Sequence, residues 1–300
     1  MKVTQLKHST MPTLTLSYYP DITQKQTAAD VRAAIGVFAK ALESQLSQDL
    51  NVEVKVEVQP VMSVPEQHEA MIAGRTHIGL LKPVAYIFAH RRVPSILPAC
   101  VAHRPIDGVV GIFYFGQLYA RRDLGINSIQ ALARAKPGTL RIAYGDRFST
   151  SNFLIPAAIM RKQEGLHPFL FFKQVLFTGG HDLAAEAVYR GEADIGAGHD
   201  GVIKILSESF PDAEQKLVQI GKENIHSDPV VVHSGILPAP VTFESIQSAC
   251  TKVAKTPPVQ KALDLFWGWV KDLSPTKHEN YASIEQALSV LGLDESDMLR

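Results

Sequence analysis

The sequence predicts an α/β protein in which two similar lobes enclose a cleft, and three observations support this. Segments typical of strands and of helices alternate along most of the chain. The 300 residues, 46% hydrophobic and 20% charged, can form one large core or two medium-sized cores, and two are expected. The order helix, glycine, short apolar strand occurs twice, at Gly74 to Gly79 and at Gly191 to Gly196, although two ordinary αβ units could also show it by chance. Such alternation indicates parallel strands joined by helices, with ligands at the carboxyl ends of the strands.

The N-terminal part provides the first set of elements. Apolar residues predict a strand at Leu14 to Tyr18, an amphipathic helix at Ala28 to Leu46 and an alternating strand at Val52 to Val58. A second helix is expected to begin after Ser63, with Pro65 at an early position, and to end at Gly74. A short strand follows at His77 to Leu81.

Two segments are expected to cross between the lobes. The run from Gly111 to Asp123 is typical of a long strand that leaves the first lobe, and Val230 to Val232 is typical of the strand that returns. Two crossing strands would form a hinge. The predicted limits are residues 13–115 plus 229–300 for the first lobe and 116–228 for an inserted second lobe, with residues 1–12 as a leader remnant or flexible N-terminus.

The C-terminal part and the cysteines are expected to be structural. Helices are predicted from Thr242 onward, including Ala262 to Val270, whose Trp267 and Trp269 are expected to pack in the core. Cys100 and Cys250 lie far apart without the spacing of a metal site, so two buried thiols are expected, with a disulfide as the alternative.

Charge and hydropathy restrict the partners. Thirty basic and thirty acidic residues give a formal charge of zero without a long run of one sign, which argues against nucleic acid or an anionic membrane surface. No segment has the roughly 18 to 20 uninterrupted apolar residues of a membrane span. A neutral small ligand or a small anion is the expected partner.

The most informative stretch runs from Leu140 to Gln163. A strand-like run ends at Gly145 and Asp146, and Ser149, Thr150 and Ser151 then precede a helical segment. The first turn of a helix has unpaired N–H groups and a partial positive charge, so hydroxyl residues there can hold an oxyanion. Plain capping of the helix is the alternative.

A second helix start is expected in the same lobe. Thr178 to Asp182 follows a strand at Val175 to Phe177, and His181 could donate an N–H group to a bound oxyanion or merely cap its own loop. Asp228 lies where the chain crosses back. Its carboxylate could accept from a ligand hydroxyl, a protonated oxyanion or an amine, or Asp228-Pro229 could be a simple turn.

Two other classes of function use the same residues. Ser149 or Ser151 with His181 and Asp228 would supply a hydrolase triad, but the chain has no Gly-x-Ser-x-Gly motif. A metal-binding protein could use histidines, but those considered show no His-x-x-x-His spacing; they are His181, His199, His226 and His233. Binding without catalysis, cofactor or metal is therefore expected.

Several of these features occur in the order typical of one family. They are Gly-Asp before Ser149-Thr150-Ser151, then Gly180-His181, the Gly-x-x-Asp of Gly191 to Asp194, and Asp228-Pro229. From about Leu14 to about Val270 the chain resembles the periplasmic phosphonate and phosphite binding proteins of ABC importers. The resemblance implies a type II periplasmic-binding-protein fold with a central cleft and a two-strand hinge. It also implies capture of phosphonate, phosphite or phosphate by lobe closure, a monomer, and an ABC permease as partner if the chain is exported.

The resemblance also implies roles for single residues. Ser149, Thr150, Ser151 and His181 would hold the phosphonate-type oxygens, Tyr114 would add a phenolic hydrogen bond, and Asp228 would take a ligand proton or an amine. Family members often have an aromatic donor where this chain has Leu80-Leu81-Lys82-Pro83, so Lys82 could supply charge there, Tyr86 could reach in instead, or Lys82 could be solvated. The second acid of aminoalkylphosphonate binders has only His199 and Asp200 as near counterparts.

The resemblance implies a periplasmic or extracytoplasmic location. Residues 1–12 contain no apolar stretch of the length that a secretory signal peptide needs. A cytoplasmic sensor of the same fold, with a different small anionic ligand, is therefore the alternative.

Overall fold

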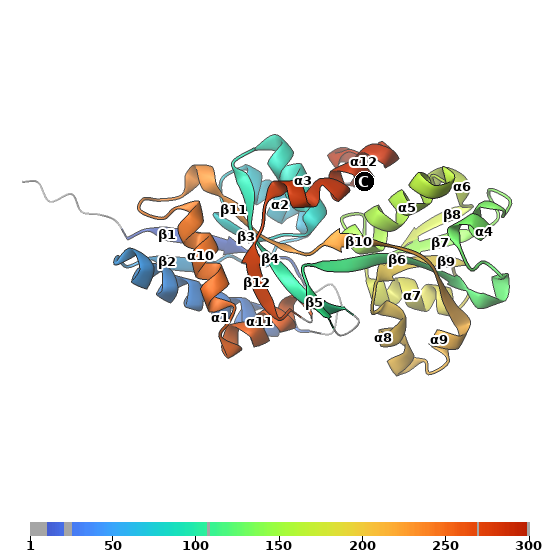
Figure 1. Ribbon diagram of the computed structural model, residues 1–300, viewed down its shortest axis with the longest axis horizontal. Coiled ribbons are helices and arrows are strands. Elements are labelled where there is room, and N and C mark those ends of the chain that lie inside the picture. Colours follow the sequence, from blue (N-terminus) through green and yellow to red (C-terminus); the bar gives the residue numbers. More distant parts are fainter. Residues whose placement is uncertain (1–10, 21–25, 107–108, 269, 299–300) are drawn as a thin grey trace, which may run out of the picture.

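Two mixed β-sheets organise the residues that the computed structural model describes, which are 11–20, 26–106, 109–268 and 270–298. Figure 1 shows the first sheet on the left and the second on the right. The first contains β1 (Thr13–Ser17), β2 (Lys55–Val58), β3 (Ile78–Leu80), β4 (Ile96–Ile106), β5 (Val109–Gly111), β11 (Pro229–His233) and β12 (Asp272–Pro275). The second contains β6 (Phe113–Arg121), β7 (Arg141–Tyr144), β8 (Gln174–Phe177), β9 (Ile195–His199) and β10 (Leu217–His226).

The strand order places a parallel group at one side of each sheet. It is β12-β4-β11-β3-β1-β2 in the first sheet, with β5 paired to β4, and β10-β6-β9-β7-β8 in the second. Strand β1 is parallel to β2 and β3, and β7 is parallel to β8 and β9, whereas the other pairs are antiparallel. The expected parallel pattern is therefore correct only where a helix connects successive strands. Strands β4, β5 and β6, like β10 and β11, follow one another without a crossover helix.

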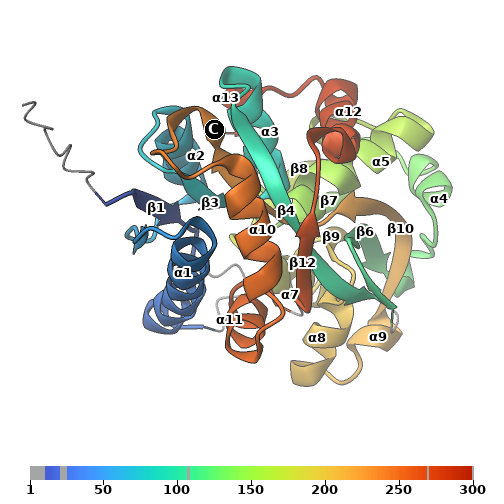
Figure 2. The same cartoon turned by 60° about the vertical axis from the view of Figure 1, so that its left-hand side comes forward.

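The helices cover both sheets. Around the first sheet lie α1 (Ala28–Leu50), α2 (Val64–Ile72), α3 (Pro83–Arg92), α10 (Phe243–Val253) and α11 (Pro257–Trp267). The second sheet carries α4 (Ile129–Ala133), α5 (Ile155–Glu164), α6 (Pro168–Phe171), α7 (His181–Tyr189), α8 (Val202–Ser209) and α9 (Ala213–Lys216). Helices α1, α10 and α11 pack together, as Figure 2 shows. In the described ranges, no helix is both long and apolar enough to cross a bilayer.

Local signals in the sequence explain where the helices begin and end. Ser63 caps α2 and forms a capping box with Glu66, as expected for a helix that begins after Ser63. Helix α1 extends to Leu50, beyond the predicted Leu46, and Asn51 follows in the left-handed region with φ 52°. The predicted helix at 262–270 instead spans Pro257–Trp267, because Gly268, with φ 69°, ends it.

Three further expectations concern the tryptophans, the N-terminal residues and the cysteines. Trp267 is buried, as predicted, whereas Trp269 lies outside the described residues. The predicted leader or flexible terminus at 1–12 falls largely on residues 1–10, which are also outside them. Cys100 and Cys250 are both buried free thiols, which confirms the expectation of two thiols.

The C-terminal segment packs against helices that flank both sheets. It comprises α12 (Ala282–Leu291) and α13 (Glu295–Met298). Helix α12 packs on α5, next to the second sheet, and on α3, next to the first. Its buried Ile284 and Leu288 belong to the same apolar cluster as Ile87 of α3 and Ile159 of α5. One apolar cluster therefore extends from one sheet to the other.

The repeated helix-glycine-strand element is present in both halves. Gly74 follows α2 with φ 68° and Gly191 follows α7 with φ 78°, so both adopt the left-handed conformation that favours glycine. The later glycines of each repeat lie in buried strands without space for a side chain. A Cβ atom at Gly196 would lie 2.7 Å from Tyr119 Oη and closer still to the ring, which is fully buried.

Gly196→Ala should therefore destabilise the protein by about 1–3 kcal/mol, since the rigid Tyr119 ring would have to move within a packed core. Gly36→Ala in α1 is the control, because its Cβ would meet nothing within 4 Å and alanine is favoured over glycine in a helix by about 0.8–1.0 kcal/mol. Urea unfolding of both variants measures the difference. Equal stability of Gly196→Ala and the parent protein would contradict the close packing of β9 on Tyr119.

Candidate functional site

A cavity of about 270 Å³ lies between the two sheets, and all seven residues predicted to bind a ligand line it. Elements of the first sheet contribute Lys82, which follows β3, and Asp228, which precedes β11. Elements around the second sheet contribute Tyr114 of β6 and His181 at the start of α7. The hydroxyl residues Ser149, Thr150 and Ser151 complete the predicted set. The structure therefore brings together residues that are up to 146 positions apart in the sequence, from Lys82 to Asp228.

The hydroxyl residues lie in an unusually wide helical turn. Residues Thr150–Leu154 form a π-helical turn that leads directly into α5, with the Leu154 N–H donating to Ser149 O at 3.0 Å. Single π turns inside helices occur frequently at functional sites. Ser149 Oγ accepts from Asn152 N at 3.0 Å, so Ser149 caps the helix in the ordinary way as well as lining the cavity.

Thr150 and Ser151 make contacts toward other elements. Thr150 Oγ1 accepts from the backbone N–H of Val84 in α3 at 3.3 Å. This contact joins the turn of Ser149, Thr150 and Ser151, called the hydroxyl turn below, to the first sheet's side of the cavity. The side chain of Ser151 hydrogen-bonds to that of Tyr114. The pKa of Tyr114 is raised by burial and by the nearby Asp228, so its phenol keeps its proton and can donate.

Lys82 supplies a buried positive charge rather than a solvated one. Its side chain is only 10% exposed, and its Nζ lies 2.9 Å from Asp146 Oδ2, in the loop after β7. Pro83 begins α3 directly after Lys82, whose extended backbone lies at the helix N-terminus beside the cavity. The Lys82–Asp146 ion pair therefore connects the carboxyl ends of β3 and β7, one in each sheet.

A second ion pair includes an arginine that the sequence did not single out. Arg104 of β4 lines the cavity and donates from Nη2 to Asp228 Oδ2 in a short contact, and its guanidinium carbon lies 5.1 Å from the ring centroid of Tyr114. Burial raises the pKa of Asp228, although Arg104 and Lys82 act against the rise. No motif marks His103-Arg104-Pro105, so only a prediction of which strand residues face the cleft could have found Arg104. Tyr19, Phe266 and Trp267 are the aromatic lining residues that the prediction also missed.

His181 is a neutral imidazole next to the hydroxyl turn. Its Nε2 lies 3.4 Å from Ser149 Oγ, and its ring centroid lies 5.1 Å from that of His199. Burial, and then the charges of Lys82 and Arg104, lower its pKa to about 3. Within the described residues its Nδ1 has no hydrogen-bond partner. A neutral His181 has one N–H group to donate, which suits an oxyanion acceptor.

The geometry does not support the two alternative sites, a hydrolase triad and a metal site of histidines. A hydrolase triad needs a carboxylate that orients the histidine, but Asp228 bonds to Arg104, and Nδ1 of His181 lacks a partner in the part of the chain that the structure describes. Of the histidines proposed as metal ligands, His181 and His199 lie close together, with ring centroids 5.1 Å apart, but no third ligand completes a metal site with them among the described residues. In the described ranges, the group of side chains compatible with a metal ion is His68, Glu69 and Glu295, away from these histidines.

The low pKa of His181 should make the protein less stable in acid. Its folded pKa of about 3 lies below the unfolded value of about 6.5. The unfolded chain therefore binds more protons between these pH values, and stability falls as the pH falls through that window. From about pH 7 to about pH 5, the loss due to His181 should be about 2 kcal/mol. Urea unfolding of the parent and His181→Asn at both pH values measures it, and equal pH dependence of the two would contradict the burial effect.

Comparisons with known proteins identify the family. Residues 22–281 match the family described as "ABC transporter, phosphonate, periplasmic substrate-binding protein". A curated relative, the phosphate-import protein PhnD of Mycolicibacterium smegmatis, is 27% identical over 197 residues, which are 64% of this chain and 56% of the relative. The alignment thus spans little more than half of that relative's length.

Solved structures share the fold. PhnD1 of Prochlorococcus marinus, solved in complex with methylphosphonate, superimposes with a TM-score of 0.68 at 21% identity, over 94% of this chain and 98% of that one. XAC2383 of Xanthomonas citri, solved with a chloride ion, gives a TM-score of 0.71 at 14% identity, over 93% and 97%. These likenesses confirm the predicted α/β fold of periplasmic binding proteins, which the structure shows as two mixed sheets. The family consists of substrate-binding proteins, in agreement with the expectation of binding without catalysis. Since the family match covers most of its length, the chain belongs to the periplasmic substrate-binding proteins of phosphonate ABC transporters.

Proposed function

We propose that this chain captures a small phosphorus oxyanion, of the phosphonate, phosphite or phosphate type, in the 270 Å³ cavity and delivers it to an ABC permease. The observation that carries the proposal is the composition of the cavity. Hydroxyl groups, a neutral imidazole and two buried cations line the same small space. Donors and positive charge in a buried site favour an anion, because hydrogen bonds to a charged group are stronger than those between neutral groups.

The roles of the lining residues follow from their contacts. Ser149, Thr150, Ser151 and His181 would surround the oxygens of the ligand, with Tyr114 donating from its phenol. Lys82 would add charge from the first sheet while it keeps its ion pair with Asp146. Arg104 would act mainly by positioning Asp228, to which it is bonded.

Asp228 would select for the protonation state of the ligand. A buried carboxylate beside the ligand accepts a hydrogen bond from an acidic P–O–H group or from an amine, but repels an oxygen that carries no proton. Sulfate, which has no proton near neutral pH, should therefore bind more weakly than a phosphorus oxyanion. A missing partner of this kind costs about 1–3 kcal/mol.

The apolar side of the cavity favours a ligand with an organic substituent. Tyr19, Phe266 and Trp267 line this side, and the Trp267 indole donates to Tyr19 Oη at 3.1 Å, which fixes both rings. The volume lies just below the range of about 300–1,000 Å³ that is typical of drug-sized ligands. A phosphonate with a small organic group would place its oxyanion on the hydroxyl turn and its carbon on this aromatic wall.

Capture would involve movement of two lobes, with the limits predicted above: residues 13–115 plus 229–300, and residues 116–228. The chain passes directly from β4 and β5 into β6 and from β10 into β11, which supports a hinge at these two connections. Opening would separate Lys82 from Asp146, since the two residues follow strands of different sheets. The proposal also includes a monomer and the periplasmic location of the family, with a cytoplasmic sensor of the same fold as the alternative.

Calorimetric titration with methylphosphonate, phosphite, phosphate, 2-aminoethylphosphonate and sulfate tests the ligand class. One phosphorus compound should bind far more tightly than sulfate, and Ser151→Ala should weaken that binding by about 5- to 150-fold, since it removes a hydrogen bond worth about 1–3 kcal/mol. Ser44→Ala is the control, because Ser44 is exposed on α1. A protein that binds none of the phosphorus compounds, or a Ser151→Ala variant with parental affinity, would contradict the proposal.

Asp146→Asn tests lobe closure. Loss of its charge should weaken the contact with Lys82 and shift the protein toward a more open state. Small-angle scattering at intermediate ligand concentrations should then show a smaller decrease in the radius of gyration for the variant than for the parent protein, because its apparent affinity is weaker. Asp123→Asn, at an exposed carboxylate paired with Arg121, is the control. An unchanged radius of gyration on ligand addition to the parent protein would argue against closure.

A further inference from the structure

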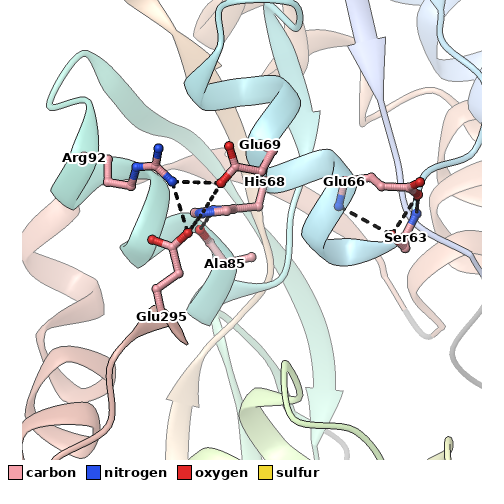
Figure 3. Close-up of polar contacts among 7 residues, drawn as sticks. All are labelled: Ser63, Glu66, His68, Glu69, Ala85, Arg92 and Glu295. Carbon is pink, nitrogen blue, oxygen red and sulfur yellow. Dashed lines mark hydrogen bonds and ion pairs between the residues drawn. The ribbon is translucent and has the colours of Figure 1, made fainter. Parts of the chain in front are cut away.

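A second polar cluster lies outside the cleft, on the side of α2 and α3 that faces the C-terminal helix. Figure 3 shows His68 and Glu69 of α2, Arg92 at the end of α3 and Glu295 at the start of α13. His68 Nε2 lies 2.7 Å from Glu295 Oε1 and 3.9 Å from Glu69 Oε1. These three atoms come from residues up to 227 positions apart in the sequence and lie within 4.8 Å of one another.

The surroundings of His68 fix the direction of its lone pair. The side chain is fully buried, and its Nδ1 lies 3.2 Å from the carbonyl oxygen of Ala85. A carbonyl can only accept, so this contact places the proton on Nδ1. Nε2 of the neutral ring then presents a lone pair to the Glu295 carboxylate, which is also an acceptor. Two acceptors at 2.7 Å require a cation between them, either a second proton on the ring or a metal ion.

The arrangement fits a metal ion in three respects. A metal-binding histidine usually donates its other N–H to a carbonyl or carboxylate, as His68 does to Ala85. Ligand atoms at 2.0–2.1 Å from a tetrahedral zinc ion stand about 3.3 Å apart, and the distances of 2.7 and 3.9 Å lie on either side of this value. Glu69 and Glu295 are partly exposed, at 49% and 21%, so their carboxylates can adjust.

We propose that His68, Glu69 and Glu295 form a site for one zinc-type divalent cation, with the fourth position open to water. One imidazole with two carboxylates is a ligand set for zinc rather than for calcium, which takes oxygen ligands. Two negative carboxylates balance the two positive charges of the ion. This site is independent of the oxyanion cavity and of the function proposed for it.

Arg92 is the group that the cation would displace. Its Nη1 donates to Glu69 Oε1 at 2.8 Å and to Glu295 Oε1 at 3.2 Å, the same oxygens that would bind the metal. The Arg92 side chain is 48% exposed, so it can turn into solvent without leaving a buried charge. Arginine and the metal ion therefore compete for one pair of carboxylates.

Metal binding would fasten the C-terminal segment to the first sheet's helices. Glu295 is the ligand that α13 contributes, and Met298 of the same helix is buried. Met298 lines a second cavity. Lys82, Asp146 and His181 line the same cavity from the two sheets. A cation at Glu295 would thus hold in place a helix that reaches the edge of the cleft.

Calorimetric titration of the chelator-treated protein with zinc chloride near neutral pH tests the site. The parent protein should bind one equivalent, and Glu69→Gln and Glu295→Gln should each bind at least about tenfold more weakly, since loss even of an outer-shell partner typically costs this much. Arg92→Ala should bind more tightly, because the competing cation is gone. Glu285→Gln is the matched control, since Glu285 pairs with the neighbouring Arg91 at 3.5 Å but lies outside the cluster.

A second readout follows the C-terminal helix itself. Zinc should slow amide hydrogen exchange across residues 292–298 in the parent protein but not in Glu295→Gln. This variant retains His68, which is fully buried, so the substitution leaves no cavity in the core. Absence of zinc binding by both the parent and Arg92→Ala would overturn the proposal. Equal zinc affinity in the parent and both glutamate variants would assign the bound ion to other histidines and overturn it as well.

Discussion

The buried ion pair between Arg104 and Asp228 is the interaction on which the geometry of this protein most depends. Arg104 lies near the end of β4, one short strand before the chain leaves the first sheet, and Asp228 lies between β10 and β11, where the chain returns. The backbone is joined at the same place, since Ala102 N donates to Asp228 O at 3.0 Å. Removing one partner of a buried pair typically costs about 3–5 kcal/mol, because the other charge is left uncompensated. The pair therefore holds the two connecting segments side by side and fixes the base of the cleft.

The same pair contributes to the balance of charge in the cavity. Lys82 with Asp146 and Arg104 with Asp228 give two positive and two negative groups around the hydroxyl turn. A buried cation without its partner would be too costly, and a site of cations alone would bind any anion. In the proposed site, these paired charges would leave the choice of anion to the neutral His181, to the hydroxyl groups of Ser149 and Ser151, and to the proton that Asp228 accepts.

An apolar cluster joins the two sheets, although each has its own strands. Helix α12 packs against α3 and α5, so burial of its apolar face depends on helices from both sides of the cleft. His167 Nε2, in the loop before α6, contacts Leu291 O at the end of α12 at 3.3 Å. The following helix, α13, is held against α2 and α3 by the polar cluster of His68, Glu69, Arg92 and Glu295. A change of lobe position must therefore either carry α12 along or alter its packing.

The sequence by itself determined the α/β class, most strands and helices, and seven of the residues that line the cavity between the sheets. These depend on local signals: alternation of apolar residues, Ser63 and Glu66 at a helix start, glycines at helix ends, and hydroxyl residues after a strand. Tertiary structure alone decided which strands run antiparallel, that Lys82 is buried against Asp146, and that Arg104 reaches Asp228 from 124 positions away. It also brought Glu295 to His68. Such pairings depend on which chain segments the two sheets place next to one another, and no periodicity within a single segment encodes this.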